Sequence, residues 1–261
     1  MRKRRLKGLV LPFALAALAF SLLTNRPVDY GQIKVTKVVD GDTVELSNGR
    51  RVRYIGIDTP ELERKTPTGW QEVKEPFGKE AKQLNEALVL GKTVRLVFDA
   101  QAIDKYNRLL AYCFVSTGDK EVFVQTELLR NGLAYLYTAP PNIKYVDTMV
   151  AAYEEAKAKK AGLWSLDLEI DSREAVHFIG QRKLVLGQVK RSRATAKVIT
   201  LTIEGLRVVI FKKDLGLFEK HNIDPLVYYR DKKVSVFGLV KEYKGEPEII
   251  ISNPWQIEIT G

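Results

Sequence analysis

Two short apolar runs that end in acidic turns constrain the fold of this 261-residue chain more than any other feature. They read VVDGDTV at residues 38–44 and RYIGIDTPE at residues 53–61, with an Asn-Gly pair between them. Apolar, β-branched runs separated by Asp-Gly and Asn-Gly pairs are typical of β-hairpins. The hairpins gather one arginine and four carboxylates at strand ends: Arg53, Asp40, Asp42, Asp58 and Glu61. Because crowded carboxylates repel one another, the sequence predicts that a cation binds there.

The rest of the first half alternates between strand-like and helix-like spacing. Strands are expected at residues 33–39, 43–46, 51–57, 93–98 and 109–115. Helices are expected at residues 76–90, 122–131 and 147–160, with Asp147 as the N-cap of the last one. Residues 62–75 are expected to form a long polar loop. The pattern predicts a small twisted β-barrel with helices at its edges.

Beyond residue 168 the signals are those of strands. Five are expected, at residues 184–189, 198–203, 207–211, 234–240 and 247–257, with a short helix at 214–221. Five strands with a helix before the fourth fit the order of an OB-fold. The predicted fold class is therefore mainly β with helices. The predicted domains are an N-terminal segment (1–30), a first barrel (31–167), a linker (168–179) and an OB-fold barrel (180–261).

The N-terminal segment predicts an exported protein. Residues 1–7 hold five basic side chains, and Gly8–Leu23 is a run of 16 residues without charge. This length lies between the core of a signal peptide and a membrane-spanning helix, so both a signal peptide and a membrane anchor remain open. The basic head should stay on the cytoplasmic side. We therefore expect a secreted or extracytoplasmic protein, or one anchored to the membrane by a hydrophobic helix with its domains outside.

Charge and rare residues narrow the kind of site. The chain carries a net charge of +10, yet Lys and Arg nearly balance Asp and Glu between residues 31 and 167, where the carboxylates lie. His177 and His221 both lie outside that region, which argues against a His-ligated zinc site there. Cys113 is the single cysteine, so no disulfide forms within the chain.

The acidic residues favour a hard cation. Carboxylates without nearby His or Cys suit calcium or magnesium, and Asp42 with Asp58 and a backbone carbonyl leave room for water and ligand oxygens. An incomplete ligand shell is typical of metal-assisted catalysis. Arg53 and Arg108 could bind charge that develops on a phosphoryl group, and Glu61 could orient or deprotonate a water. Together these groups suit the attack of water on a phosphodiester.

Further motifs carry a family resemblance. The segment DKYNRLLAY at residues 104–112, NGLAY at 131–135 and GLWS at 162–165 follow the two acidic runs in order. Together these motifs resemble the thermonuclease, or staphylococcal-type nuclease, family over about residues 33–167. The resemblance implies an OB-like five-stranded barrel with three helices, one calcium ion, and cleavage of DNA and RNA that leaves 3′-phosphate ends.

The resemblance also implies roles for individual residues. Asp42, Asp58 and the Thr59 carbonyl would bind the calcium ion, with Asp40 behind them. The residues expected to be catalytic are Arg53, Glu61 and Arg108. The residues expected to line the nucleotide site are Lys105, Tyr106, Tyr135 and Tyr137.

The last third of the chain is basic. Nine Lys and Arg residues stand between Arg182 and Lys213 against one acid, Glu204. OB-folds bind single strands through a basic groove and aromatic side chains, and residues 180–259 also resemble OB-fold nucleic-acid-binding domains. The candidate contacts lie in an expected hairpin at 190–193 and just after it: Lys190, Arg191, Arg193 and Lys197. The candidate stacking residues are Phe211, Tyr228, Tyr229, Phe237, Tyr243 and Trp255.

The sequence therefore predicts an exported, calcium-dependent endonuclease with a C-terminal OB domain that binds nucleic acid, with single strands preferred. The alternative is a non-catalytic or membrane-anchored nucleic-acid-binding scaffold built on the nuclease fold. Loss of Arg53, Glu61 or Arg108 would favour that alternative, and all three residues are present.

Overall fold

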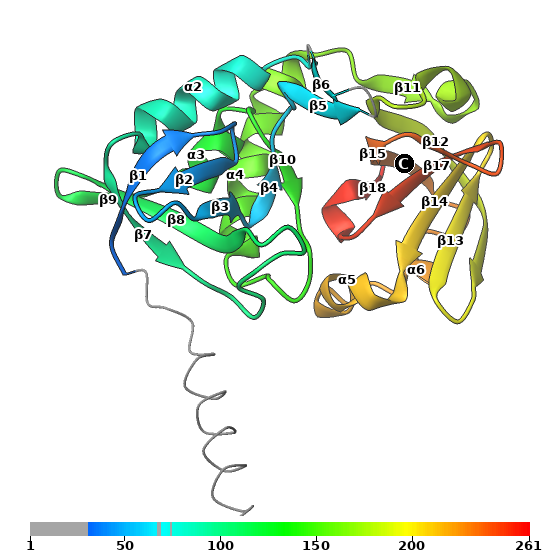
Figure 1. Ribbon diagram of the computed structural model, residues 1–261. Helices are drawn as coiled ribbons and strands as arrows, with labels where there is room; N and C mark the ends of the chain where they lie inside the picture. The colour runs from blue at the N-terminus through cyan, green and yellow to red at the C-terminus, as the bar shows by residue number, and fades with distance from the viewer. Residues whose placement is uncertain (1–30, 67–68, 74) are drawn as a thin grey trace, which may run out of the picture. The chain divides into compact units, whose positions relative to one another are not determined.

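The computed structural model describes residues 31–66, 69–73 and 75–261 (Figure 1). Residues Gln32–Gly261 form one compact unit. The hydrophobic helix predicted at residues 8–23 lies outside the described residues. Within the described residues, no helix has the length and apolar character needed to cross a membrane.

The first β-structure is a closed five-stranded barrel, as predicted. Its strands are β1 (Ile33–Val38), β2 (Thr43–Leu46), β3 (Arg51–Tyr54), β7 (Thr93–Val97) and β8 (Leu109–Thr117). They pair in the order β3-β2-β1-β7-β8, and a parallel ladder between β3 and β8 closes the barrel. β9 (Lys120–Phe123) extends β8 as a hairpin. Alternate residues such as Val52 and Tyr54 point into the core, which is why the strand pattern was readable.

Three helices accompany this barrel, in agreement with the prediction. They are α2 (Gly78–Val89), α3 (Val124–Arg130) and α4 (Val146–Ala158), drawn in cyan and green in Figure 1. Asp147 was wrongly predicted as a helix cap, because Tyr145 holds that position and Asp147 lies in the first turn of α4. The helix predicted at 122–131 is shorter at its start, because β9 continues to Phe123.

Two short strand pairs were missed in the sequence. Gly56, at a φ of 87°, interrupts the run after β3, and β4 (Gly56–Asp58) then pairs with β10 (Tyr135–Tyr137). The positive φ favours glycine at this position, and a Cβ there would also lie 2.3 Å from the methyl carbon of Met149, which would have to move. The predicted loop at 62–75 contains a hairpin of β5 (Glu63–Thr66) and β6 (Gly69–Glu72). These strands are short and polar, so they lack the alternation that reveals a half-buried strand.

The second β-structure is drawn in yellow-green to red in Figure 1. Its main strands are β12 (Arg182–Ala194), β13 (Val198–Ile203), β14 (Leu206–Phe211), β15 (Lys233–Leu239) and β17 (Glu246–Ile251). They follow the order β17-β14-β13-β12-β15, with β14 and β17 parallel. The OB-fold predicted for this region stays a prediction. Two short helices, α5 (Gly216–Lys220) and α6 (Pro225–Tyr228), lie between the third and fourth of these strands.

Smaller elements complete this sheet and correct two expectations. The strand predicted at 247–257 is split, because Pro254 begins a 3-10 turn before β18 (Ile257–Ile259). The hairpin predicted at 190–193 lies within β12, and the chain turns at residues 195–197 instead. The other short elements are β11 (Glu169–Asp171), β16 (Lys241–Tyr243), and the 3-10 helices Gly162–Ser165, Ser172–Phe178, Lys212–Asp214 and Pro254–Gln256.

An aromatic cluster joins the two β-structures. The ring of Tyr135 in β10 lies 5.3 Å from that of Phe237 in β15, and the Trp164 ring lies 5.0 Å from Phe237. Leu163 is buried in the same cluster, and Leu184 packs against it. The cluster therefore contains side chains from both sides of the predicted domain boundary at 168–179, which itself remains a prediction.

Candidate active site

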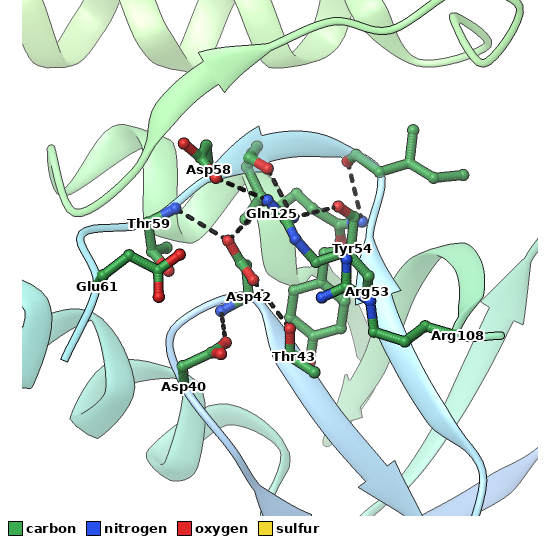
Figure 2. Close-up of polar contacts among 12 residues, drawn as sticks. Asp40, Asp42, Thr43, Arg53, Tyr54, Asp58, Thr59, Glu61, Arg108 and Gln125 are labelled. Atoms are coloured by element: carbon green, nitrogen blue, oxygen red, sulfur yellow. Dashed lines mark hydrogen bonds and ion pairs between the residues drawn. The ribbon is translucent and has the colours of Figure 1, made fainter. Parts of the chain in front are cut away.

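The turn between β1 and β2 presents Asp42 to the loop that follows β4. The Asp42 backbone N–H donates to Asp40 Oδ1 at 3.0 Å, which fixes the turn. Asp42 Oδ1 accepts from the Thr43 hydroxyl at 3.0 Å, and Oδ2 accepts from the Thr59 backbone N–H at 2.9 Å (Figure 2). Gly41 permits this approach, because a Cβ there would lie 2.8 Å from the Thr59 side chain. Asp42 is therefore buried with both carboxylate oxygens engaged.

Arg53 lies at the centre of the carboxylates. Its Nη2 is 3.0 Å from Asp42 Oδ2 and 2.9 Å from Asp58 Oδ1, so one guanidinium nitrogen bridges the two side chains. Nη1 donates to the backbone carbonyls of Tyr54 and Ile57, at 2.8 and 2.7 Å. The Arg53 side chain is 14% exposed. A buried guanidinium with this many acceptors is held in one orientation.

Acidic charge exceeds what Arg53 neutralises. Burial is the largest effect on Asp42 and raises the pKa of its carboxyl to about 6, although Arg53 acts in the opposite direction. Burial, followed by the charges of Asp42, Asp58 and Glu75, also raises the pKa of Glu61 above its usual range. Burial lowers the pKa of Arg53, but the neighbouring carboxylates outweigh it and raise that pKa overall. Burial is thus the main reason why the carboxyls of Asp42 and Glu61 favour their protonated form.

The oxygen donors fit a hard cation. Asp42 and Asp58 offer carboxylate oxygens without His or Cys nearby, and a bound cation would favour the ionised form of the buried Asp42 carboxyl. Among the described residues, no group of three or more His, Cys, Asp and Glu side chains lies close enough to hold a metal ion by itself. A cation would therefore depend on the two aspartates, a backbone carbonyl and water, as the sequence predicts for Asp42, Asp58 and Thr59.

Glu61 lies at the edge of this cluster. Its backbone N–H donates to Glu75 Oε2 at 3.0 Å, which ties the loop after β4 to the segment that precedes α2. Figure 2 shows its carboxylate on the same side of the site as Asp40 and Asp42. Glu61 is exposed as a residue, in contrast to Asp42. A half-solvated carboxyl with a raised pKa suits proton exchange with a water molecule.

Arg108 lies in the turn before β8, as the sequence predicts, and pairs with Asp104. Asp104 organises its turn by accepting from the backbone N–H groups of Tyr106 and Arg108, both at 2.9 Å, and from Arg108 Nε at 2.8 Å. Asn107 adopts the expected left-handed conformation, with φ of 64°. The turn precedes β8, which pairs with β3 so that Arg53 is opposite Leu110. The Arg108 backbone is thus near Arg53, but its guanidinium pairs with Asp104 rather than with the acidic cluster.

The predicted nucleotide-binding residues form two groups. In the turn before β8, Lys105 lies over the ring of Tyr106, which is 68% exposed. In β10, Tyr135 is directly opposite Asp58 on β4, whereas Tyr137 is opposite Gly56. Tyr137 is 53% exposed, but Tyr135 is buried in the aromatic cluster. The structure therefore leaves Tyr106 and Tyr137 accessible for stacking, whereas Tyr135 is buried next to Asp58 in the ladder of β4 and β10.

Two supporting residues were missed in the sequence. Asn85 in α2 is fully buried; its Nδ2 donates to the Asp40 carbonyl at 3.2 Å and its Oδ1 accepts from the Tyr54 hydroxyl at 3.0 Å. Gln125 in α3 is also fully buried and accepts from the Cys113 backbone N–H at 3.1 Å. Each is an amide on the inner face of a helix. The sequence signal for such a residue is an amide side chain at a helix position whose spacing otherwise predicts an apolar, buried residue.

Arg182 was also missed as a site residue, although it was counted in the basic region. It begins β12 in the second β-structure, and its Nη2 pairs with Asp58 Oδ2. Its guanidinium carbon lies 4.7 Å from the centre of the Tyr135 ring. The two oxygens of Asp58 therefore each bind a different arginine.

A groove lies on the outer face of the second β-structure. Its volume is about 370 Å³, and it is lined by Arg191, Arg193, Thr195, Val198, Thr200, Thr202 and Arg207. The register explains the row of side chains, because Arg191 is opposite Thr202, which is opposite Arg207. Lys190 and Lys197 are exposed but do not line the groove. Of the predicted stacking residues, Tyr229 and Phe237 are buried in the core, whereas Tyr228 and Tyr243 are exposed.

Comparison with known proteins identifies the family. The family profile described as "Staphylococcal nuclease homologue" matches residues 51–166. A thermonuclease of Staphylococcus hyicus is 35% identical over 136 residues, which cover 51% of this chain and 75% of that protein. Endonuclease YncB of Bacillus subtilis is 36% identical over 138 residues, covering 51% and 61%. An uncharacterized protein of Methanocaldococcus jannaschii is 36% identical over 148 residues, covering 51% and 70%. The relatives named as thermonuclease and endonuclease support a nuclease function, and the chain belongs to the staphylococcal nuclease family.

Proposed function

We propose that this protein is an endonuclease that hydrolyses phosphodiester bonds of DNA and RNA with calcium and leaves 3′-phosphate ends. The observation that carries the proposal is the bridge from Arg53 to Asp42 and Asp58, with Glu61 beside it. This arrangement unites a cation-binding pair, a phosphate-binding guanidinium and a carboxyl suited to proton transfer. The relatives named as nucleases contribute the reaction class.

The calcium site would consist of Asp42, Asp58 and the Thr59 carbonyl, completed by water and substrate oxygen. When bound, the ion would supply Lewis-acid stabilisation of the phosphoryl oxygens and help to position water. Asp40 supports this site through its bond to the Asp42 backbone. The hydrogen bond from Thr59 to Asp42 would keep the two parts of the site at a fixed separation.

The protein side chains would carry the remaining steps. Glu61 would accept the proton of the attacking water, because its raised pKa makes it a better base than an ordinary exposed carboxylate. Arg53 would bind a phosphoryl oxygen. Its Nη1 would meanwhile stay fixed by the backbone carbonyls of Tyr54 and Ile57. Arg108 would turn from Asp104 to the substrate, since a partly exposed ion pair contributes little stability and is readily exchanged.

The substrate would be held by tyrosines and by the second β-structure. Lys105, Tyr106, Tyr135 and Tyr137 would form the nucleotide site, with Tyr106 and Tyr137 exposed enough to stack on bases. We further propose that the second β-structure is an OB-fold domain that binds single strands. Its groove presents Arg191 and Arg193 from β12 and Arg207 from β14, with the threonines of β13 between them, so its lining carries three positive charges that could bind phosphates. We propose export through residues 1–30, as a signal peptide or a membrane anchor.

The test is digestion of single-stranded DNA and of RNA by the purified full chain, with calcium or with a chelator. We expect cleavage of both with calcium and none with the chelator. Glu61→Gln keeps the size of the side chain but cannot accept the proton, so its turnover should fall by at least about a hundredfold. Full activity in the chelator would refute the calcium assignment, and an unchanged rate in Glu61→Gln would refute the role of Glu61.

A further inference from the structure

Arg182 connects the second β-structure to the acidic cluster. It lies 124 positions after Asp58 in the sequence, yet its Nη2 pairs with Asp58 Oδ2. Asp58 and Tyr135 are opposite one another in the ladder of β4 and β10, and the Arg182 guanidinium lies over the Tyr135 ring. Arg182 therefore contacts two adjacent residues of the site, although it lies outside the family match at residues 51–166.

The surroundings of Arg182 leave one side of its guanidinium open. The side chain is 30% exposed, and the Asp58 side chain is 25% exposed. A guanidinium has five donors in a flat fork, and its ion pair with Asp58 is made through Nη2. Stacking on an aromatic ring orients the fork without using its donors. The geometry is therefore that of a partly free, oriented phosphate-binding group rather than of an arginine enclosed in the core.

A cation at Asp58 would conflict with the pairing observed. Asp58 Oδ1 is already paired with Arg53 at 2.9 Å, and Oδ2 is paired with Arg182. A divalent ion that takes an oxygen of Asp58 places like charge beside the Arg182 guanidinium, and like charges at this range repel. Arg53 is retained by two backbone carbonyls and by Asp42, whereas Arg182 has Asp58 and the face of a ring. Arg182 is therefore the arginine that would leave.

We propose that Arg182 is a phosphate-binding residue of the active site, supplied by the second β-structure and released from Asp58 when calcium binds. The inference rests on the proposed nuclease function and deepens it. While it remains stacked on Tyr135, the released fork meets a phosphodiester next to the scissile one, where two parallel hydrogen bonds to phosphate are available. Arg182 thus competes with calcium for Asp58 and cooperates with calcium in holding nucleic acid.

The competition and the cooperation predict effects of opposite sign. In Arg182→Ala, calcium alone should bind several-fold more tightly by titration calorimetry, because Asp58 loses its competing partner. In the Glu61→Gln background, which prevents cleavage, a labelled eight-nucleotide single-stranded oligodeoxynucleotide should bind about tenfold more weakly with calcium present. Arg182→Lys keeps the charge and should restore part of the oligonucleotide affinity. Lys183→Ala is the matched control, since Lys183 is the next residue of β12 and lies over Phe178 instead.

The outcomes separate this inference from the proposed function. Unchanged oligonucleotide affinity in Arg182→Ala would overturn the inference while the parent enzyme remains a nuclease. Calcium and oligonucleotide affinities that both fall, with no rescue by Arg182→Lys, would show that Arg182 is structural and would also overturn it. If the wild-type chain does not cleave nucleic acid with calcium, the proposed function itself fails. Tighter calcium binding with weaker oligonucleotide binding supports the inference.

Discussion

Asp42 accepts a 2.9 Å hydrogen bond from the Thr59 backbone N–H, across seventeen positions of sequence. This bond joins the turn after β1 to the loop after β4, and each end carries a predicted calcium ligand. The separation between the two ends is set by Gly41, whose missing side chain lets the Thr59 and Ala81 side chains approach. The geometry of the acidic cluster therefore depends on one glycine.

Gly41→Ala should damage both stability and activity. The new methyl would meet Ala81 Cβ and Thr59 Cγ2 at 2.8 Å, so the turn must move away from Thr59. We expect a loss of about 1–3 kcal/mol in the free energy of unfolding, measured by urea denaturation, and weaker calcium binding. Gly216→Ala is the control, because among the described residues nothing lies within 4 Å of its Cβ. Equal stabilities for the two variants would contradict this account.

The stability of the calcium-free protein should depend on the ionisation of Asp42. Its pKa is about 6 in the fold against an ordinary value of 3.8, so between these values the folded chain holds a proton that the unfolded chain has lost. The stabilisation is complete below about pH 4, and on the order of 3 kcal/mol is lost as pH rises through 6. Asp42→Asn removes this contribution. Urea denaturation in chelator should therefore show that the unfolding free energy of Asp42→Asn rises relative to that of the wild type from pH 4 to 7. A difference between the two that stays constant with pH would refute the assignment.

Asn85→Ala should lower activity through the turn that holds Asp40. The change leaves the Asp40 carbonyl and the Tyr54 hydroxyl without their buried partner, at a cost of about 2–3 kcal/mol in unfolding free energy. Tyr54→Phe is the matched control, because it removes the hydroxyl but leaves Asn85 bonded to Asp40. We expect both variants to be less stable and Asn85→Ala alone to lose turnover at saturating calcium. Equal turnover in the two variants would show that Asn85 acts on stability alone.

Arg108→Ala should affect catalysis far more than folding. Loss of a donor to the charged phosphoryl group should lower kcat by roughly 10²–10³-fold. The pair with Asp104 is partly exposed, so the melting temperature should change little. Arg95→Ala is the comparison, since Arg95 forms an exposed pair with Glu121 in the same barrel. A change in kcat of less than tenfold in Arg108→Ala would mean that Arg108 has been assigned the wrong role.

The groove of the second β-structure should contribute electrostatically to binding. The double variant Arg191→Ala/Arg193→Ala removes two charges from the groove lining, whereas Lys190→Ala/Lys197→Ala removes two charges beside it. We expect the first to weaken binding of a long single-stranded oligonucleotide and to lower the slope of log affinity against log salt by about 1.4. The second should leave the slope nearly unchanged. Identical slopes would exclude the groove as the binding surface.

The first barrel was predictable because its strands are apolar runs bounded by turn residues, and β3 alternates between the core and the outside. Val52 and Tyr54 point inward and Arg53 points to the carboxylates. The catalytic role predicted for Arg53 came from the family resemblance and stays a prediction. Helix ends were less accurate, because Tyr145 caps α4 without a side-chain hydrogen bond. The β5–β6 hairpin was missed because its polar residues carry no periodic signal.

The remaining parts of the site depend on tertiary contacts. The pairing of β4 with β10 joins segments of three residues each, too short to show a period, yet it puts Tyr135 opposite Asp58. Arg182 was visible as one of several basic residues, but nothing in the sequence marks which of them reaches Asp58. Arg108 was predicted to be catalytic, which stays a prediction, and the structure shows that its guanidinium pairs with Asp104.

The shared aromatic cluster couples the unfolding of the two β-structures. Tyr135, Leu163 and Phe237 bury one another's surface across the predicted boundary, so unfolding of either β-structure exposes apolar area on the other. The two β-structures, which together make up the compact unit Gln32–Gly261, should therefore unfold in a single cooperative transition. A protease that cuts near residue 168 would therefore release a first barrel with an exposed apolar patch and lower stability. The stability of the first barrel thus depends on the intact chain.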